Sequence, residues 1–234
     1  MLLNDKAIRD LCLGEEYEDW QPTEDGLRMK CIKDRHPCLA PMITPFSEAV
    51  SGNGVISYGL SHAGYDLRLG PEILVFKNSF MDAVDPKAFG DLAYRRRMFD
   101  RLFYPHGFDL PEDDGHLYTE MNGSTMLIPP HGYILGRSHE YLRIPRHLKG
   151  RCTGKSTLAR AGIIVNLTPL EPGWSGYLTL EIANATPCPA KIYVGEGICQ
   201  MELELLIAPP ERDYGDKKGQ YQGQTGVTPA RVKE

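Results

Sequence analysis

Glu181 stands out because of the segment that carries it. From Tyr177 to Ile182 the side chains alternate in character, which is typical of a strand with one face in the core. The alternation places Glu181 on the same face as Tyr177 and Thr179, opposite three aliphatic side chains. A carboxylate held in this way can take up and return protons. A single Glu on a strand is also commonly only solvated, so Glu181 needs partners before it indicates catalysis.

A second group of reactive residue types follows Gly154, where the sequence reads Gly-Lys-Ser-Thr up to Thr157. Backbone amides and hydroxyls at such a turn suit phosphate oxygens. A P-loop also needs a Gly five residues before Gly154, where Lys149 stands, so that motif is excluded. The spacing of Ser156 and Arg160 predicts that they share one face of a helical turn. A plain helix cap explains the four residues alone more simply.

Two further segments combine polar side chains with turn residues. The stretch 166–181 is typical of a strand, a Pro/Gly turn containing Glu171, and a second strand that ends in Glu181. The segment 213–234 is rich in Gly, Lys and Gln and has almost no apolar content, so it cannot supply a core. We expect it to be disordered or ordered by a ligand. Either segment taken alone is compatible with a surface loop.

The elements that must position these residues are mostly short strands. From Val55 onward, runs of Ile, Val, Leu and Tyr alternate with turns, and the chain holds 24 Gly and 18 Pro, which favours a barrel or sandwich. Strands are expected at Leu67–Leu69, Glu72–Phe76, Ser124–Ile128, Tyr133–Ser138, Glu140–Ile144, Ile163–Leu167, Tyr177–Asn184, Ala190–Val194 and Ile198–Leu206.

Helices are expected in two places. Apolar residues at helical spacing predict a short amphipathic helix from Asp5 to Glu16. A mixture of Arg and apolar residues after Asp91 predicts a second helix that ends near Pro105. The charged, weakly periodic stretch from Glu15 to Arg35 is interpreted as a loop or small insertion.

Composition narrows the class of protein. The 234 residues are 41% hydrophobic and 24% charged, which is ordinary for a globular protein. The formal charge is −5 and the longest basic run is Arg95–Arg97, so we expect no nucleic-acid partner. No apolar stretch approaches the roughly 20 residues that span a bilayer, so we expect no membrane partner. Six scattered cysteines and a polar N-terminus indicate reduced thiols in a cytoplasmic protein.

The order of the motifs resembles the dCTP deaminase family and, more distantly, the dUTPases. The resemblance rests on Gly59-Leu60-Ser61 with Gly64-Tyr65-Asp66-Leu67-Arg68, on Gly154–Ile163, on Pro172–Gly176 with Leu180-Glu181, and on the Gly/Gln-rich segment after Tyr214. It covers Val55–Ala88 and Leu127–Val227 and implies a mainly β, dUTPase-like distorted β-barrel or jelly roll with a short N-terminal helix and a helical insertion. Residues 1–212 would form one domain, with insertions near 15–41 and 90–123. Residues 213–234 would be a flexible lid over the triphosphate.

The resemblance also implies roles for individual residues. Glu181 would be the catalytic base that takes a proton from water, which attacks C4 of cytosine, and that returns protons to N3 and the leaving amine. Ser156 and Arg160 would hold the water and the tetrahedral intermediate from the neighbouring subunit, so an active protein would be a homotrimer. Substrate dCTP would be bound by Lys155, Thr157, Thr168, Glu171, Tyr214, Lys218, Gln220 and Gln224. Gln220 stands where the family often has Lys, and Lys217 or Lys218 are possible substitutes.

The expected chemistry needs no zinc. Zinc cytidine deaminases carry His-x-Glu and Pro-Cys-x-x-Cys. Here Pro187-Cys188-Pro189 lacks the second Cys, and no His is followed two residues later by Glu. The resemblance implies no protein-held metal, with Mg²⁺ bound only through the substrate triphosphate.

Three functions remain open at this stage. The first is deamination of dCTP to dUTP and ammonia. The second is a bifunctional dCTP deaminase/dUTP diphosphatase or a dUTPase, which the acid at Glu171 keeps possible. The third is a catalytically silent nucleotide-binding regulator, against which the presence of Ser156, Arg160 and Glu181 argues.

Overall fold

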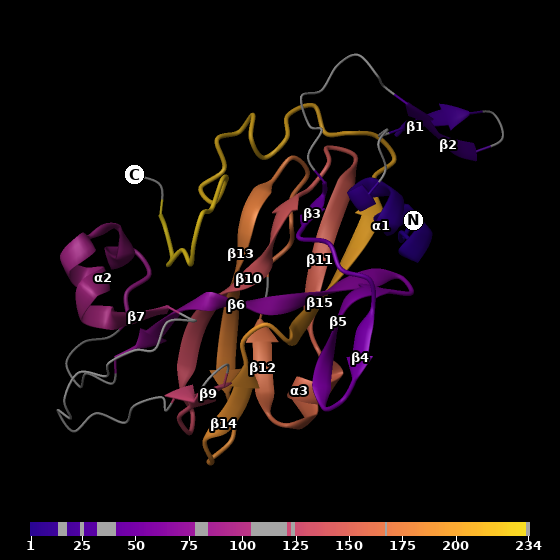
Figure 1. The fold of residues 1–234 in the computed structure, drawn as a ribbon. Helices are drawn as coiled ribbons and strands as arrows, with labels where there is room; N and C mark the ends of the chain where they lie inside the picture. The colour runs from indigo at the N-terminus through magenta and orange to yellow at the C-terminus, as the bar shows by residue number, and fades with distance from the viewer. Residues whose placement is uncertain are drawn as a thin grey trace.

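The computed structural model describes residues 1–13, 18–23, 26–31, 41–77, 84–103, 121–122, 125–166 and 168–232. Strands dominate the described chain and helices are short (Figure 1). The helices are α1 (Asp5–Leu13), η1 (Ala88–Gly90), α2 (Leu92–Met98) and α3 (Ser156–Arg160). The strands of the large sheet are β3 (Ile43–Thr44), β4 (Val50–Gly52), β5 (Val55–Ser61), β6 (Gly64–Phe76), β7 (Phe99–Phe103), β10 (Tyr133–Arg143), β11 (Leu148–Gly154), β12 (Ile163–Asn166), β13 (Ser175–Asn184) and β15 (Gly197–Leu205).

The large sheet is antiparallel and curled around its long strands. Its main path runs β11-β15-β6-β10-β13-β12, with β5 and β7 also pairing with β6. The first half of β6 pairs with β15 and β5, and the second half pairs with β10 and β7. This change of partners occurs at Gly70, where an added Cβ would lie 2.8 Å from the Ser138 carbonyl oxygen. The pairing of β10 shifts register near the same point, so the two strands bend together.

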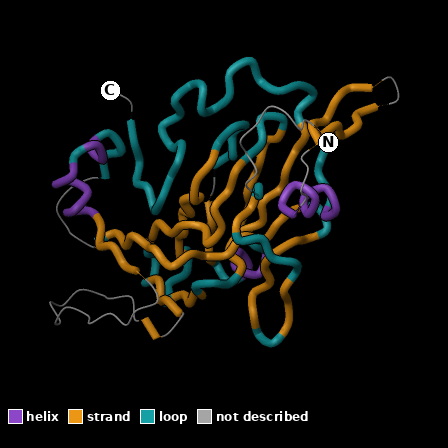
Figure 2. The backbone as a smooth tube through the Cα atoms, turned by 45° about the horizontal axis from the view of Figure 1, so that its top comes forward, coloured by secondary structure: helices purple, strands orange, loops and turns teal. Residues whose placement is uncertain are grey.

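Smaller elements complete the described chain. A three-stranded sheet contains β8 (Met121–Asn122), β9 (Thr125–Ile128) and β14 (Ala190–Tyr193). A separate hairpin contains β1 (Glu18–Thr23) and β2 (Gly26–Cys31). Figures 1 and 2 show α1 and α2 on opposite sides of the strands, and Figure 1 shows α3 beside β12.

The core lies against the apolar face of β13. Leu178, Leu180 and Ile182 are 4%, 0% and 0% exposed, whereas the intervening residues are only half-buried, which confirms the predicted alternation. They belong to one apolar cluster with strands β6, β10 and β15. Burial of each such side chain contributes about 1.5–3 kcal/mol, so this face fixes which way Glu181 points.

The mainly β architecture predicted from the sequence is confirmed, with several corrected boundaries. The expected strands either side of Gly70 are one strand, β6, and those either side of His139 are one strand, β10. Turn residues within them produce bends instead of breaks, because paired neighbours hold the backbone extended on both sides. The stretch after Glu15, which the sequence predicts as a loop or small insertion, contains the β1–β2 hairpin.

The predicted helix ending near Pro105 is wrong at its C-terminal end. It begins after Asp91, whose side chain caps the amides of Ala93 and Tyr94, and it ends at Met98. The next residues form β7, in which Phe99 pairs with Phe76. The helix ends at Met98 because the backbone from Phe99 onward forms hydrogen bonds with the edge of β6. Helical periodicity in the sequence does not reveal this pairing.

Candidate functional site

Glu181 lies in the middle of a lateral row that crosses the sheet. It pairs with Asn166 on β12 on one side and with Leu135 on β10 on the other. Leu135 in turn pairs with Leu74 on β6. Side chains directly opposite each other across strands lie within contact distance, so this register surrounds the carboxylate with one polar and one apolar neighbour.

The polar neighbour holds the carboxylate in place. Asn166 Nδ2 donates a hydrogen bond of 2.7 Å to Oε2 of Glu181. The second carboxylate oxygen is thereby left on the side away from Asn166. The sequence predicts a strand at Asn166 but no role for this residue, because its proximity to Glu181 depends on the register of β12 against β13, which the sequence does not specify.

A cavity of about 250 Å³ opens beside Glu181. One part of its wall is aromatic and aliphatic, and includes Phe76, Phe89, Phe99, Tyr133 and Leu135. The remaining wall is more polar and is made by Thr168, Pro169, Leu170, Glu171, Trp174, Leu178, Thr179, Tyr214, Tyr221, Gln224, Thr228 and Ala230. A concave site with an apolar end and a few convergent polar groups is typical of a small-molecule pocket.

Several residues predicted from the sequence meet in this cavity. Glu181, Thr168, Glu171, Tyr214 and Gln224 all line it. The carboxylate of Glu171 is also 3.7 Å from Lys149 Nζ, a pair in which both side chains are partly exposed. The structure therefore brings together residues that are up to 56 positions apart in the sequence, from Thr168 to Gln224.

The C-terminal segment forms one side of the cavity through backbone contacts. Tyr177 N donates to the Gln224 carbonyl at 2.9 Å, and Gly223 N donates to Ser175 O at 2.8 Å. Trp174 Nε1 donates to the Tyr221 carbonyl at 2.7 Å. These contacts run alongside the start of β13, so the segment is packed on the strand that carries Glu181.

Lys218 and Gln220 belong to the same segment but do not line the cavity. Lys218 is exposed with a φ of 49° in a turn. The carbonyl oxygen of Gln220 accepts a hydrogen bond of 3.0 Å from Arg231 Nη1. Their roles as ligands of a triphosphate stay predictions.

The residues of α3 lie away from the cavity beside Glu181. Ser156, Thr157 and Arg160 are exposed and absent from the cavity wall. The predicted shared helical turn is confirmed, and the helix begins after Lys155 without a side-chain cap. The chain joins the sheet after α3 at Ile163, which pairs with Asn184 on β13. Asn184 is three residues along β13 from Glu181, which corresponds to about 10 Å along the strand.

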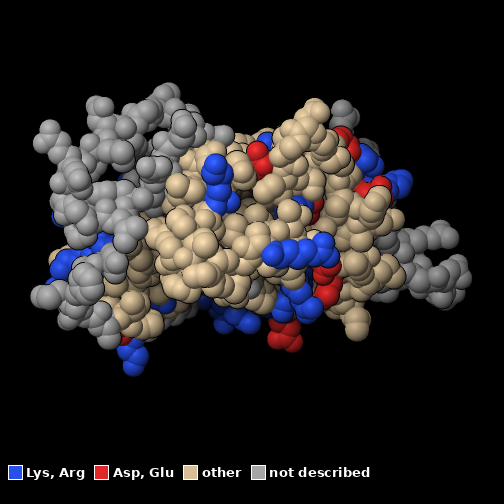
Figure 3. Space-filling view, turned by 90° about the horizontal axis from the view of Figure 1, so that it is seen from below, with Lys and Arg blue, Asp and Glu red and all other residues tan. Residues whose placement is uncertain are grey.

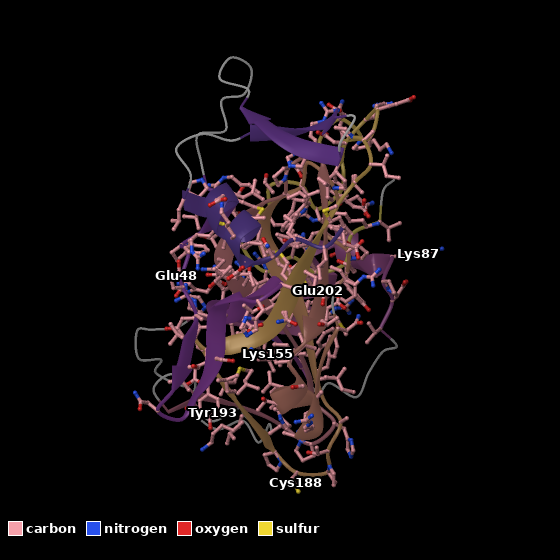
Figure 4. All side chains as sticks on the ribbon, turned by 90° about the vertical axis from the view of Figure 1, so that its right-hand side faces the viewer. Glu48, Lys87, Lys155, Cys188, Tyr193 and Glu202 are labelled. Atoms are coloured by element: carbon pink, nitrogen blue, oxygen red, sulfur yellow. The ribbon has the colours of Figure 1, made fainter. Side chains whose placement is uncertain are left out.

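Lys155 is turned inward. Its ammonium binds the carboxylate of Asp66, which is 8% exposed, and lies 3.1 Å from Ser57 Oγ. Figure 4 shows Lys155 beside β5 and β15. This ammonium therefore has protein partners already, and its role as a phosphate ligand stays a prediction.

Tyr133 is the titratable neighbour of Glu181 across the strands. It lines the cavity on β10, and its pKa is raised to about 12 by burial and, to a smaller extent, by the charge of Glu181. Its hydroxyl is therefore protonated at neutral pH and can serve as a hydrogen-bond donor.

Within the described ranges, no group of three or more His, Cys, Asp or Glu side chains is placed to hold a metal ion. No helix among the same residues is long and apolar enough to cross a membrane. Cys12, Cys152, Cys188 and Cys199 are free thiols.

Comparison with known proteins decides the family. Residues 32–206 match the model of the "dCTP deaminase-like" family. The chain belongs to the dCTP deaminase-like family. Family members include the dCTP deaminase of Gemmatimonas aurantiaca, 46% identical over 82% of this chain and 91% of the relative, and that of Acidobacterium capsulatum, 44% identical over 82% and 92%.

The fold of the family is also seen in a solved structure. The 2'-deoxycytidine 5'-triphosphate deaminase from Agrobacterium tumefaciens superimposes with a TM-score of 0.51 at 17% identity. The match covers 87% of this chain and 48% of that one, so the chain spans about half the length of the Agrobacterium protein. This likeness shows that the chain shares the mainly β fold of that deaminase.

Proposed function

We propose that this protein hydrolyses dCTP to dUTP and ammonia with Glu181 as the proton-transferring group. The observation that carries the proposal is the position of Glu181, which lines a cavity of about 250 Å³ and is oriented by Asn166. The curated relatives that cover most of the chain are dCTP deaminases, which supports the same reaction.

The proposed reaction begins with water held beside Glu181. The carboxylate takes one proton from the water while the oxygen bonds to C4 of cytosine, and it passes this proton to N3. It then takes the proton of the new C4 hydroxyl group and gives it to the amine nitrogen. The C4–N bond breaks as the C4 carbonyl of dUTP forms, and the amine leaves as ammonia. Each step uses one carboxylate as base and then as acid, which general acid–base catalysis requires.

A second copy of the chain is part of the proposal. Ser156 and Arg160 are exposed on α3 and do not line the cavity of their own chain. The edge strand β12 carries Ile164, an aliphatic side chain that is 52% exposed. The end of the molecule with α3 and β12 shows a broad uncharged surface between separate Lys and Arg side chains (Figure 3), which favours contact with another copy. A homotrimer would bring Ser156 and Arg160 of one subunit to Glu181 of its neighbour.

Magnesium would be bound through the triphosphate, as the resemblance to the family implies. When bound, it would neutralise phosphate charge. Four of the residues proposed to contact the nucleotide line the cavity, namely Thr168, Glu171, Tyr214 and Gln224. The others proposed are Lys155, Thr157, Lys218 and Gln220. We expect a cytoplasmic enzyme without zinc.

Mixed trimers test the shared site. Glu181→Gln and Ser156→Ala are each expected to be inactive alone, because each lacks one half of the site. In coexpressed mixtures, random assembly pairs an intact Glu181 with an intact Ser156 in about a quarter of sites, and activity should return to that level. Mixtures that stay as inactive as the separate variants would contradict the trimeric site.

A bifunctional enzyme is the second candidate, because Glu171 lines the same cavity as Glu181. A carboxylate near the sugar–phosphate end could activate water for cleavage of dUTP to dUMP and pyrophosphate. Chromatography of the products distinguishes the two. If dCTP yields dUMP and Glu171→Gln stops the reaction at dUTP, the enzyme is bifunctional.

A further inference from the structure

A second apolar cluster lies apart from the main core and joins the C-terminal segment to the segment 88–103. It contains Leu74, Phe89, Tyr94, Met98, Phe99, Leu135 and Val227. Most of these residues come from the helical segment 88–103 and the strands beside it. Val227 alone comes from the C-terminal segment, and it is 4% exposed. Figures 1 and 2 show this segment passing β13 and β10 and approaching α2.

A group of charged side chains around Glu72 lies next to this second apolar cluster. Glu72 on β6 is 4% exposed, with carboxylate oxygens 3.5 Å from Arg101 Nε and 3.7 Å from Arg137 Nε. Val227 N donates a hydrogen bond of 3.2 Å to Oε2 of the same carboxylate. A buried carboxylate needs such partners, so the amide of Val227 adds one of the hydrogen bonds that compensate for its burial.

The neighbouring residues of the C-terminal segment fit the same surface closely. A Cβ at position 226 would lie 2.5 Å from Glu72 Oε2, so Gly226 lets the segment approach the carboxylate. Thr228 N donates to Thr179 Oγ1 on β13 at 3.2 Å. Three successive residues of the segment therefore contact Glu72, the apolar cluster and the strand that carries Glu181.

This contact shapes the cavity beside Glu181. Thr228 and Ala230, directly after Val227, line the cavity, and so do Phe89 and Phe99 of the helical segment. Neither Glu72 nor Val227 lines it. The contact between Glu72 and Val227 therefore affects the cavity indirectly, because it holds Thr228 and Ala230 in the cavity wall.

We propose that Glu72 and Val227 are positioning residues that dock the C-terminal segment, and that the segment 88–103 serves as the apolar half of this dock. The consequence for catalysis rests on the proposed function: a docked segment completes the cavity that binds dCTP. Undocking would remove one wall and weaken substrate binding, while Glu181 and Asn166 would keep their geometry.

Val227→Ala tests the dock with little risk to the β fold, because Val227 lies outside the main core cluster. Loss of two buried methyl groups is expected to shift docking about tenfold, seen as faster hydrogen exchange of the amides of Gly223, Val227 and Thr228, each of which donates a hydrogen bond to the sheet. The KM for dCTP should rise by up to the same factor, with kcat changed less than about twofold. Val232→Ala is the matched control, since Val232 is 53% exposed in the same segment.

Glu72→Gln tests the ionic half of the dock. It keeps an acceptor for Val227 N but removes the charge that faces two guanidinium groups, so exchange of the same amides and KM should both increase. Glu196→Gln is its control, because Glu196 also accepts a backbone amide hydrogen bond, of 2.8 Å from Ile56, but lies away from the segment.

The two claims fail separately. Unchanged amide exchange in Val227→Ala and Glu72→Gln would overturn the dock, whether or not the protein deaminates dCTP. Faster exchange with an unchanged KM would overturn its link to the cavity. If the unsubstituted protein leaves dCTP intact, the proposed function fails. Docking of the C-terminal segment is then tested by the hydrogen-exchange measurement alone.

Discussion

Asn166→Ala should slow deamination without affecting folding. Asn166 is exposed on the edge strand β12, and its amide donates a 2.7 Å hydrogen bond to Glu181 Oε2. A hydrogen bond to a charged group contributes about 1.5–3 kcal/mol, and the exposure of this pair favours the lower end. If the bond orients the carboxylate in the transition state, losing about 1.5 kcal/mol lowers kcat about tenfold.

The assay is steady-state release of ammonia from dCTP, with thermal unfolding measured alongside. Asn166→Asp sharpens the test, because it is nearly isosteric but replaces the donor with a second carboxylate. Repulsion between two adjacent negative groups should make it slower than Asn166→Ala. If Asn166→Ala kept kcat within about twofold of the parent at the same stability, the hydrogen bond would have no part in orienting the base.

Further substitutions test the fold and its charges. Lys155→Met should lower the free energy of unfolding by about 3–5 kcal/mol in urea titrations, because it leaves the mostly buried Asp66 carboxylate without its partner; an unchanged midpoint would show that the pair does not stabilise the fold. Leu180→Ala, at a position that is 0% exposed, should cost about 2–5 kcal/mol in the same measurement, and a loss well below that would place Leu180 outside the tightly packed core. The pKa of His139 is held below 6.5 by burial and then by two neighbouring arginines, so the unfolded chain binds the proton more tightly. Stability linked to His139 should therefore be present above pH 6.5 and fall as the pH drops below it, and His139→Gln should remove this part of the pH dependence; identical pH profiles for both proteins would contradict it.

The sequence predicts the β fold and the face of Glu181 because alternation between Tyr177 and Ile182 is a local signal with period 2. The same local signals miss the continuity of β6 through Gly70-Pro71, because pairing partners far away in the sequence hold that strand extended. The helix after Asp91 is predicted, but its end is not, because the open edge of β6 recruits Phe99 into a strand.

In the candidate site, too, the sequence predicts residues that lie in recognisable motifs and misses those that depend on long-range contacts. Motif resemblance identifies Glu181 and Glu171, and both line the cavity. Asn166 is missed because only the register of two strands brings it to the carboxylate. The dock at Glu72 is missed as well, because residues 72 and 227 are joined by a contact across 155 positions. Segment 213–232 has the composition of a disordered tail yet packs on β13 through backbone hydrogen bonds, which composition does not encode. Whether it moves as a lid stays a prediction.

The central claim is tested most directly by incubating the pure protein with dCTP and Mg²⁺, with Glu181→Gln in parallel, and resolving nucleotides and ammonia by chromatography. The Gln side chain still offers an oxygen to Asn166, so the cavity should be kept while the base is lost. The account predicts equal amounts of dUTP and ammonia from the parent and a rate lower by about 10²–10⁴ for the variant. Intact dCTP with the parent protein, or undiminished deamination by Glu181→Gln, would contradict it.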